Sequence, residues 1–138
     1  MEKIKVYIAS PYTNGWTSDN VRRQLEAQHT LMNYDFAAFA PLLSHFSEIY
    51  SHRPEHEWFA WDLEWLKVCH VLVRLRVFDG KNETTSKGAD EEMERAREWG
   101  IPVFEFESLE QLDAWAKNIN KEELFELYKI EQNEKINI

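Results

Sequence analysis

The chain has 138 residues, enough for one domain with its own hydrophobic core. A net charge of −9 argues against binding to a nucleic-acid polymer, which needs a basic surface, and a hydrophobic content of 43% argues against disorder. The single cysteine, Cys69, excludes an internal disulfide and is typical of the reducing cytoplasm, where we expect the protein. The sequence shows no signal peptide or apolar stretch of membrane length, so we expect no membrane partner.

Segments rich in β-branched and aromatic residues alternate with segments whose apolar residues recur at helical spacing. Breakers such as Pro11, Asn14-Gly15 and Gly100 separate these segments. We predict strands over 3–9, 36–40, 71–77 and 102–106, and helices over 18–33, 57–68, 86–100, 109–118 and 121–130.

The remaining segments are predicted to be irregular, with loops over 10–15, 42–55 and 79–85 and a frayed tail over 131–138 after a single domain of residues 1–130. This order predicts an α/β fold, namely a Rossmann-like (flavodoxin-like) open and mainly parallel sheet with helices on both faces. Ligands of such sheets bind outside the carboxyl ends of the strands. The loops that follow the first two strands and the loop before Ser86 should meet at that edge.

The segment from Ser86 to Gly100 carries the most informative acidic residue, Glu92. Helical side chains lean toward the N-terminus, so Glu92 is expected to project over Gly88, where no side chain blocks it. A carboxylate in such a notch can act as a nucleophile. The alternative is that Glu92 is one of several solvated acids on this helix, as Glu91 and Glu94 are expected to be.

Two further residues stand out against apolar surroundings. Tyr7 lies inside the first strand and is either a core tyrosine or part of a site. Asp62 lies four residues after Trp58 and four before Leu66, so it interrupts an apolar stripe and is expected to be desolvated. It is either a functional acid or a buried helix acid that bonds a neighbouring loop.

The histidines at 45, 52 and 56 could indicate a metal site, but no cysteine or tight acidic cluster accompanies them. We therefore expect no metal, and a base-stacking or solvated role for these side chains. Three tryptophans at helical spacing between residues 58 and 65 favour core packing over a stacking platform.

These residues lie in four motifs that together resemble the nucleoside 2-deoxyribosyltransferase superfamily, which includes the 2′-deoxynucleoside 5′-phosphate N-hydrolases and related nucleotide N-ribosidases. The resemblance covers roughly Lys3 to Phe104. Its motifs are Val-Tyr-Ile-Ala-Ser-Pro-Tyr in the first strand, Phe-Ala-Pro-Leu after the second, Trp-Asp-Leu-Glu-Trp-Leu in the middle helix, and Ser-x-Gly-x-x-x-Glu-x-x-x-Ala.

The resemblance implies that Glu92 is a nucleophile for the anomeric carbon of a sugar, that Asp62 handles the proton on the base, and that Tyr7 orients the nucleophile. This chemistry suits the residue types, because a carboxylate can capture an oxocarbenium-like centre and a protonated base leaves more easily. Burial among tryptophans should raise the pKa of Asp62 toward the acid role. The resemblance further implies no cofactor, a homodimer or higher homo-oligomer, and a substrate-binding set of Ser10, Pro11, Thr13, Asn14, His45, Ser86 and Gly88.

Position 86 bears on the reaction, because relatives that act on free nucleosides tend to carry an acid there and the monophosphate hydrolases resemble this chain in having serine. A serine hydroxyl at a helix start suits a phosphate, whereas Asp90 and Glu91 in the first turn count against an anion site. The C-terminal part also lacks the segment with which the transferases complete a neighbour's site. We therefore expect an N-glycosidase for nucleoside 5′-monophosphates. Base exchange between deoxynucleosides and a non-catalytic nucleotide-binding or sensor module remain as alternatives.

Overall fold

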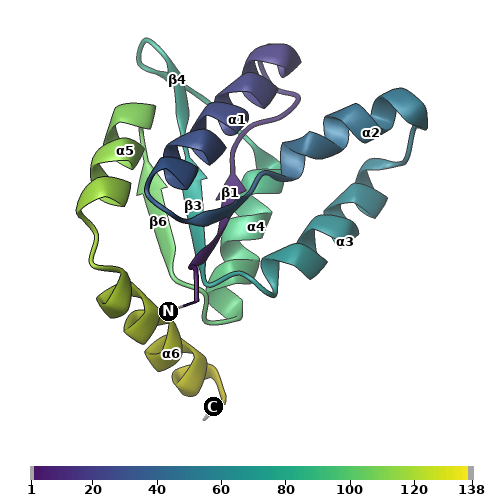
Figure 1. Ribbon diagram of the computed structural model, residues 1–138. Coiled ribbons are helices and arrows are strands. Elements are labelled where there is room, and N and C mark those ends of the chain that lie inside the picture. The colour runs from purple at the N-terminus through teal and green to yellow at the C-terminus, as the bar shows by residue number, and fades with distance from the viewer. Residues whose placement is uncertain (1, 137–138) are drawn as a thin grey trace.

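The computed structural model describes residues 2–136 and contains a four-stranded parallel sheet with helices on both faces (Figure 1). The strand order is β2-β1-β3-β6, and every neighbouring pair is parallel, which confirms the predicted α/β fold. The strands are β1 (Lys5–Ala9), β2 (Ala37–Phe39), β3 (Val71–Leu75) and β6 (Val103–Phe106). The helices are α1 (Thr17–Asn33), the 3-10 turn η1 (Pro41–Leu43), α2 (Ser44–Tyr50), α3 (Glu55–Leu66), α4 (Lys87–Glu98), α5 (Leu109–Asn118) and α6 (Lys121–Ile136). None of the helices described within residues 2–136 is both long and apolar enough to cross a membrane.

The alternation of side chains along β1 divides the core into two layers. Val6 and Ile8 pack in one cluster with apolar residues of α1, α5 and α6. Tyr7 and Ala9 point to the opposite face, where they pack with apolar residues of α3 and α4. The strand at the centre of the molecule therefore presents Tyr7 to the helix that carries the most informative acid of the sequence.

The C-terminal helix α6 corrects the prediction that residues 131–138 form a frayed tail. The helix continues to Ile136. The Gln132 side chain donates hydrogen bonds to the backbone carbonyls of Trp99 and Gly100 at 2.7 and 2.9 Å. These bonds hold the end of α6 against the α4–β6 connection, and the last two residues of the chain lie outside the described residues.

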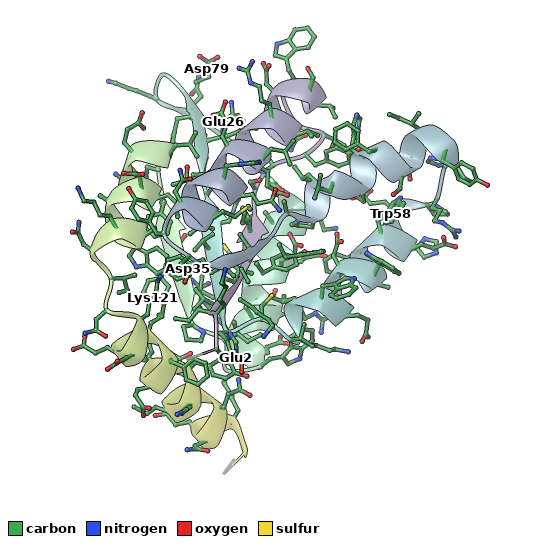
Figure 2. All side chains as sticks on the ribbon, in the orientation of Figure 1. Glu2, Glu26, Asp35, Trp58, Asp79 and Lys121 are labelled. Atoms are coloured by element: carbon green, nitrogen blue, oxygen red, sulfur yellow. The ribbon has the colours of Figure 1, made fainter. Side chains whose placement is uncertain are left out.

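The segment predicted as an irregular loop over 42–55 is instead mostly helical. It contains η1 and α2, and α2 runs beside α3 as an arm that projects from the sheet (Figure 1). Trp58 of α3 lies between the two helices, and its indole N–H donates to the Glu48 carboxylate of α2 (Figure 2). A seven-residue helix is shorter than two turns, so its apolar spacing is too brief to show a clear period.

The arm leaves large apolar side chains exposed, which corrects the expectation of core packing for two of the three tryptophans of α3, Trp61 and Trp65, whereas Trp58 is half-buried. The most exposed are Phe46 (52%), Ile49 (77%), Tyr50 (93%), Trp61 (54%) and Trp65 (44%). The expected self-association, which would cover such side chains, stays a prediction.

The loop predicted over 79–85 is largely a β-hairpin, formed by β4 (Val77–Asp79) and β5 (Asn82–Thr84). Gly80 adopts a φ of 62° as the first residue of the two-residue turn, a conformation that glycine adopts without steric cost. Asp79 marks the tip of this hairpin in Figure 2. The hairpin leads from the sheet directly into the start of α4.

Candidate active site

The centre of the candidate site is a buried contact between β1 and α4. The Tyr7 hydroxyl donates a hydrogen bond to the Glu92 carboxylate. Tyr7 is fully buried and Glu92 is only 7% exposed, so the solvated-surface interpretation of Glu92 is wrong. Glu92 reaches this position because it shares the sheet-facing side of α4 with the buried residues Ala89, Met93 and Ala96.

The first turn of α4 has a cap and an open notch. The Ser86 hydroxyl oxygen accepts a hydrogen bond from the Ala89 N–H at 3.1 Å, which makes Ser86 the N-cap. A Cβ added at Gly88 would meet nothing within 4 Å. Gly88 lies one turn before Glu92, so open space borders the helix on the side toward which the Glu92 side chain leans.

Asp62 on α3 lies close enough to Tyr7 and Glu92 for its charge to affect both of them. Its side chain is half-buried, and its Oδ1 atom is buried without a hydrogen-bond partner among the described residues. The alternative role of bonding a neighbouring loop is therefore not seen at this atom. Burial raises the pKa of Asp62 to about 7.

Glu92 and Asp62 belong to one cluster, and burial raises the pKa of both carboxyls. Burial raises the pKa of Glu92 to about 8; the Tyr7 hydrogen bond and the Arg74 charge oppose this rise, whereas the charge of Asp62 adds to it. Burial also raises the pKa of Tyr7, so its hydroxyl stays protonated and remains a donor. Two carboxyls with raised pKa values in one cluster hold about one proton between them near neutral pH.

The loop after β1 is fixed by Gln24, a residue that the sequence analysis missed. The fully buried Gln24 amide donates to the Ser10 hydroxyl at 2.8 Å and to the Ile8 carbonyl at 3.2 Å. Its amide oxygen accepts the Leu42 N–H at 2.8 Å. The signal in the sequence is an amide in the buried stripe of α1. Ser10 is thus buried beside the end of β1, with its oxygen already used as an acceptor.

The other loop residues of the expected binding set differ in how they are held. Pro11 is buried, and Thr13 is exposed. Asn14 is exposed, and its side-chain amide donates to the Thr85 carbonyl at 2.7 Å. This bond ties the loop after β1 to the segment that precedes α4, so the structure brings two of the three expected loops together.

His45 lies at the start of α2, where its ring Nδ1 shares a hydrogen bond of 2.8 Å with the Tyr12 hydroxyl. This contact joins the third expected loop to the loop after β1. His52 instead pairs with Glu48 at 2.8 Å, and His56 is exposed. Across residues 2–136, no group of three or more histidine, cysteine or acidic side chains is placed to hold a metal ion.

Arg74 is a second residue that the sequence analysis missed. It lies in β3 beside Ala9 of β1, and its side chain is 1% exposed. Its guanidinium contacts Asp90 Oδ1 at 3.2 Å and the Leu75 carbonyl at 3.1 Å, whereas its Nε has no partner among the described residues. The signal in the sequence is an arginine inside a β-branched run that suits a buried strand.

We predict that Asp62→Asn stabilises the fold at neutral pH. The carboxyl has a pKa of about 7 in the folded protein, whereas an unfolded aspartate has a pKa of about 3.9. A raised pKa contributes stability that is fully present below the unfolded value and is lost as the pH rises through the folded value. Asparagine does not ionise, so the variant avoids a loss of up to about 4 kcal/mol in the free energy of unfolding, at ~1.4 kcal/mol per pH unit. Melting temperatures of the two proteins should coincide near pH ~4 and diverge up to pH ~7; equal values at every pH would contradict a desolvated Asp62.

Comparisons with known proteins place the fold and the family. The structure superposes on a solved 2-deoxyribosyltransferase from the psychrotolerant bacterium Bacillus psychrosaccharolyticus with a TM-score of 0.58 and 19% sequence identity. The match covers 87% of this chain and 95% of that one, and at this identity it establishes a shared fold. No curated protein matches the sequence. The family model described as "Domain of unknown function (DUF7768)" matches residues 4–106, so the chain belongs to that family.

Proposed function

We propose that the protein is an N-glycosidase that hydrolyses the bond between base and sugar in a nucleoside 5′-monophosphate. The observation that carries the proposal is the buried Tyr7–Glu92 contact with the desolvated Asp62 carboxyl in the same cluster. The fold shared with a 2-deoxyribosyltransferase supports chemistry at a nucleoside glycosyl bond.

The two carboxyls suit two different roles. Hydrogen bonding from Tyr7 favours the ionised form of Glu92. Desolvation favours the neutral form of Asp62, whose buried Oδ1 has no hydrogen-bond partner within residues 2–136. Burial raises the pKa of Glu92 to about 8 and that of Asp62 to about 7, an order that by itself would place a shared proton on Glu92. Because the Tyr7 hydroxyl donates to the Glu92 carboxylate, we assign the negative charge to Glu92 and the shared proton to Asp62 for the reaction. This arrangement supplies one general acid and one nucleophile from two acidic residues.

Cleavage then proceeds in two balanced steps. A Glu92 carboxylate oxygen bonds to the anomeric carbon while the bond to the base nitrogen breaks; its electron pair leaves with the base, which takes the Asp62 proton. Water next attacks the anomeric carbon and displaces Glu92, and a proton of that water returns to Asp62. The products are the free base and the sugar phosphate.

The start of α4 supports binding of a 5′-phosphate. The first N–H groups of a helix have no partner inside it, and the Ser86 hydroxyl lies among them. Asp90 contacts the Arg74 guanidinium at 3.2 Å, so one of the two acids that counted against an anion site is paired with a positive charge. The other, Glu91, lies 4.0 Å from the Lys87 ammonium. The open space at Gly88 supplies room beside this helix start.

Base exchange between deoxynucleosides is the second candidate, and the shared fold with a 2-deoxyribosyltransferase favours it. Incubation of the purified protein with a panel of nucleosides and monophosphates, with and without an acceptor base, separates the candidates. Free base with sugar phosphate is expected. A new nucleoside formed only with an acceptor would identify the transferase, and binding without any product would identify a non-catalytic module.

The acid role of Asp62 predicts a dependence on the leaving group. Asp62→Asn should lower kcat on a natural monophosphate by ~10²-fold or more, because the base then leaves without its proton. A substrate with a p-nitrophenolate leaving group needs no protonation and should suffer much less. Equal losses on both substrates would remove Asp62 from the acid role, and the melting curves described above show whether the variant is folded.

A further inference from the structure

We propose that Arg74 is a positioning residue for Glu92: its buried guanidinium holds the first turn of α4 against β3 and stabilises the negative charge of the Glu92 carboxylate. The proposal adds a residue to the proposed glycosidase site and, for its catalytic consequence, rests on that function. Arg74 itself is not assigned a contact with substrate.

The geometry places Arg74 on the same face of the sheet as the site. Tyr7 is in register with Leu72, and Ala9 is in register with Arg74 one pleat further along the parallel strands. Side chains two residues apart on a strand share a face, so Arg74 projects toward α4, as the buried Leu72 does. Its contact with Asp90, two residues before Glu92 in the sequence, confirms this direction.

Burial of the Arg74 guanidinium costs free energy that an apolar side chain filling the same space would not cost. A guanidinium with 1% exposure loses nearly all of its hydration. Its one carboxylate partner, Asp90, has a 60% exposed side chain, and its Nε has no partner among the described residues. A buried ion pair of this kind is weak evidence for stability, so a role in the electrostatics of the site explains it better.

The charged groups around Glu92 show how the Arg74 guanidinium affects the Glu92 carboxylate. The groups that act on Glu92 are the hydroxyl of Tyr7 on β1, the carboxyl of Asp62 on α3, the guanidinium of Arg74 on β3 and the carboxylate of Glu91 on α4 itself. The groups that act on Arg74 are Asp90 on α4, Arg76 between β3 and β4, and Glu83 on β5. Arg74 therefore opposes the effect of burial and of two neighbouring acids, which keeps the nucleophile ionised at lower pH.

The test measures the Glu92 pKa directly in the protein without substrate. The Glu92 signal is followed by 13C NMR of carboxyl-labelled glutamate and assigned by its loss in Glu92→Gln. Five proteins are compared: wild type, Arg74→Met, Arg74→Lys, Asp90→Asn and the double variant Arg74→Met/Asp90→Asn, so that the effect of Arg74 is measured with and without its partner. We expect Arg74→Met to raise the Glu92 pKa by about one pH unit in both backgrounds, and Arg74→Lys to leave it near the wild-type value.

An unchanged Glu92 pKa in Arg74→Met would overturn the proposal, as would an equal rise in Arg74→Lys. If Arg74→Met alone fails to fold, the comparison of Asp90→Asn with the double variant replaces it, because the double variant contains no unpaired charge at this place. In active proteins, the acidic limb of the pH profile of kcat/KM should move to higher pH with the Glu92 pKa. A wild-type protein that turns over no nucleoside or nucleotide would refute the proposed function while leaving the NMR result to decide on Arg74.

Discussion

Glu92→Gln is expected to abolish turnover, with a loss in kcat of at least ~10³-fold, because the amide cannot form the bond to the anomeric carbon. The fold should be retained. Burial raises the pKa of Glu92, so the ionised carboxylate costs stability at neutral pH and the neutral amide avoids that cost. The measurement is single-turnover kinetics on a monophosphate together with a thermal melt at neutral pH.

Glu94→Gln is the matched control for this substitution. Glu94 lies on the same helix but is exposed, so its replacement makes the same chemical change without touching the buried cluster. It should leave kcat within about twofold of wild type, as surface substitutions usually do. If the Glu92→Ala variant kept a kcat within tenfold of wild type, covalent capture of the sugar by Glu92 would be excluded.

The sheet was predictable from the sequence because its strands are short apolar runs with strong boundaries. Val71–Leu75 is buried at every position, and such a β-branched run is distinctive. The α2 helix was not predictable in the same way, since only seven residues form it and its stability depends on contacts with α3. The β4–β5 hairpin could have been found from Gly80-Lys81, because glycine at the first central position is typical of a two-residue hairpin turn.

The candidate site was predictable only as far as side-chain direction follows from local periodicity. The position of Glu92 over Gly88, and its place on the inner side of α4, follow from helical spacing. Arg74 could not be assigned in this way, because only the register between β1 and β3 shows which residues it approaches. The same holds for Gln24, whose three partners come from two segments, the end of β1 and the 3-10 turn η1.

Ser86→Asp is expected to reverse substrate preference if a 5′-phosphate binds at the start of α4. The new carboxylate would stand beside a phosphate dianion, at a cost of ~2–4 kcal/mol for an effective dielectric near 20. The value of kcat/KM for a monophosphate should therefore fall by ~30- to 1000-fold, at ~1.4 kcal/mol per factor of ten. A free nucleoside should be spared or improved, because its 5′-hydroxyl can donate to the carboxylate.

Ser108→Asp supplies the control, because Ser108 caps α5 as Ser86 caps α4 but lies on a helix of the opposite face of the sheet. Its hydroxyl oxygen accepts the Gln111 N–H at 3.1 Å, the same distance as in the Ser86 cap. Aspartate caps helices as well as serine does, so both variants should retain their stability. Only Ser86→Asp should change the ratio of kcat/KM between a nucleoside and its monophosphate. If that ratio stays constant in both variants, Ser86 is a helix cap alone and the phosphate binds elsewhere.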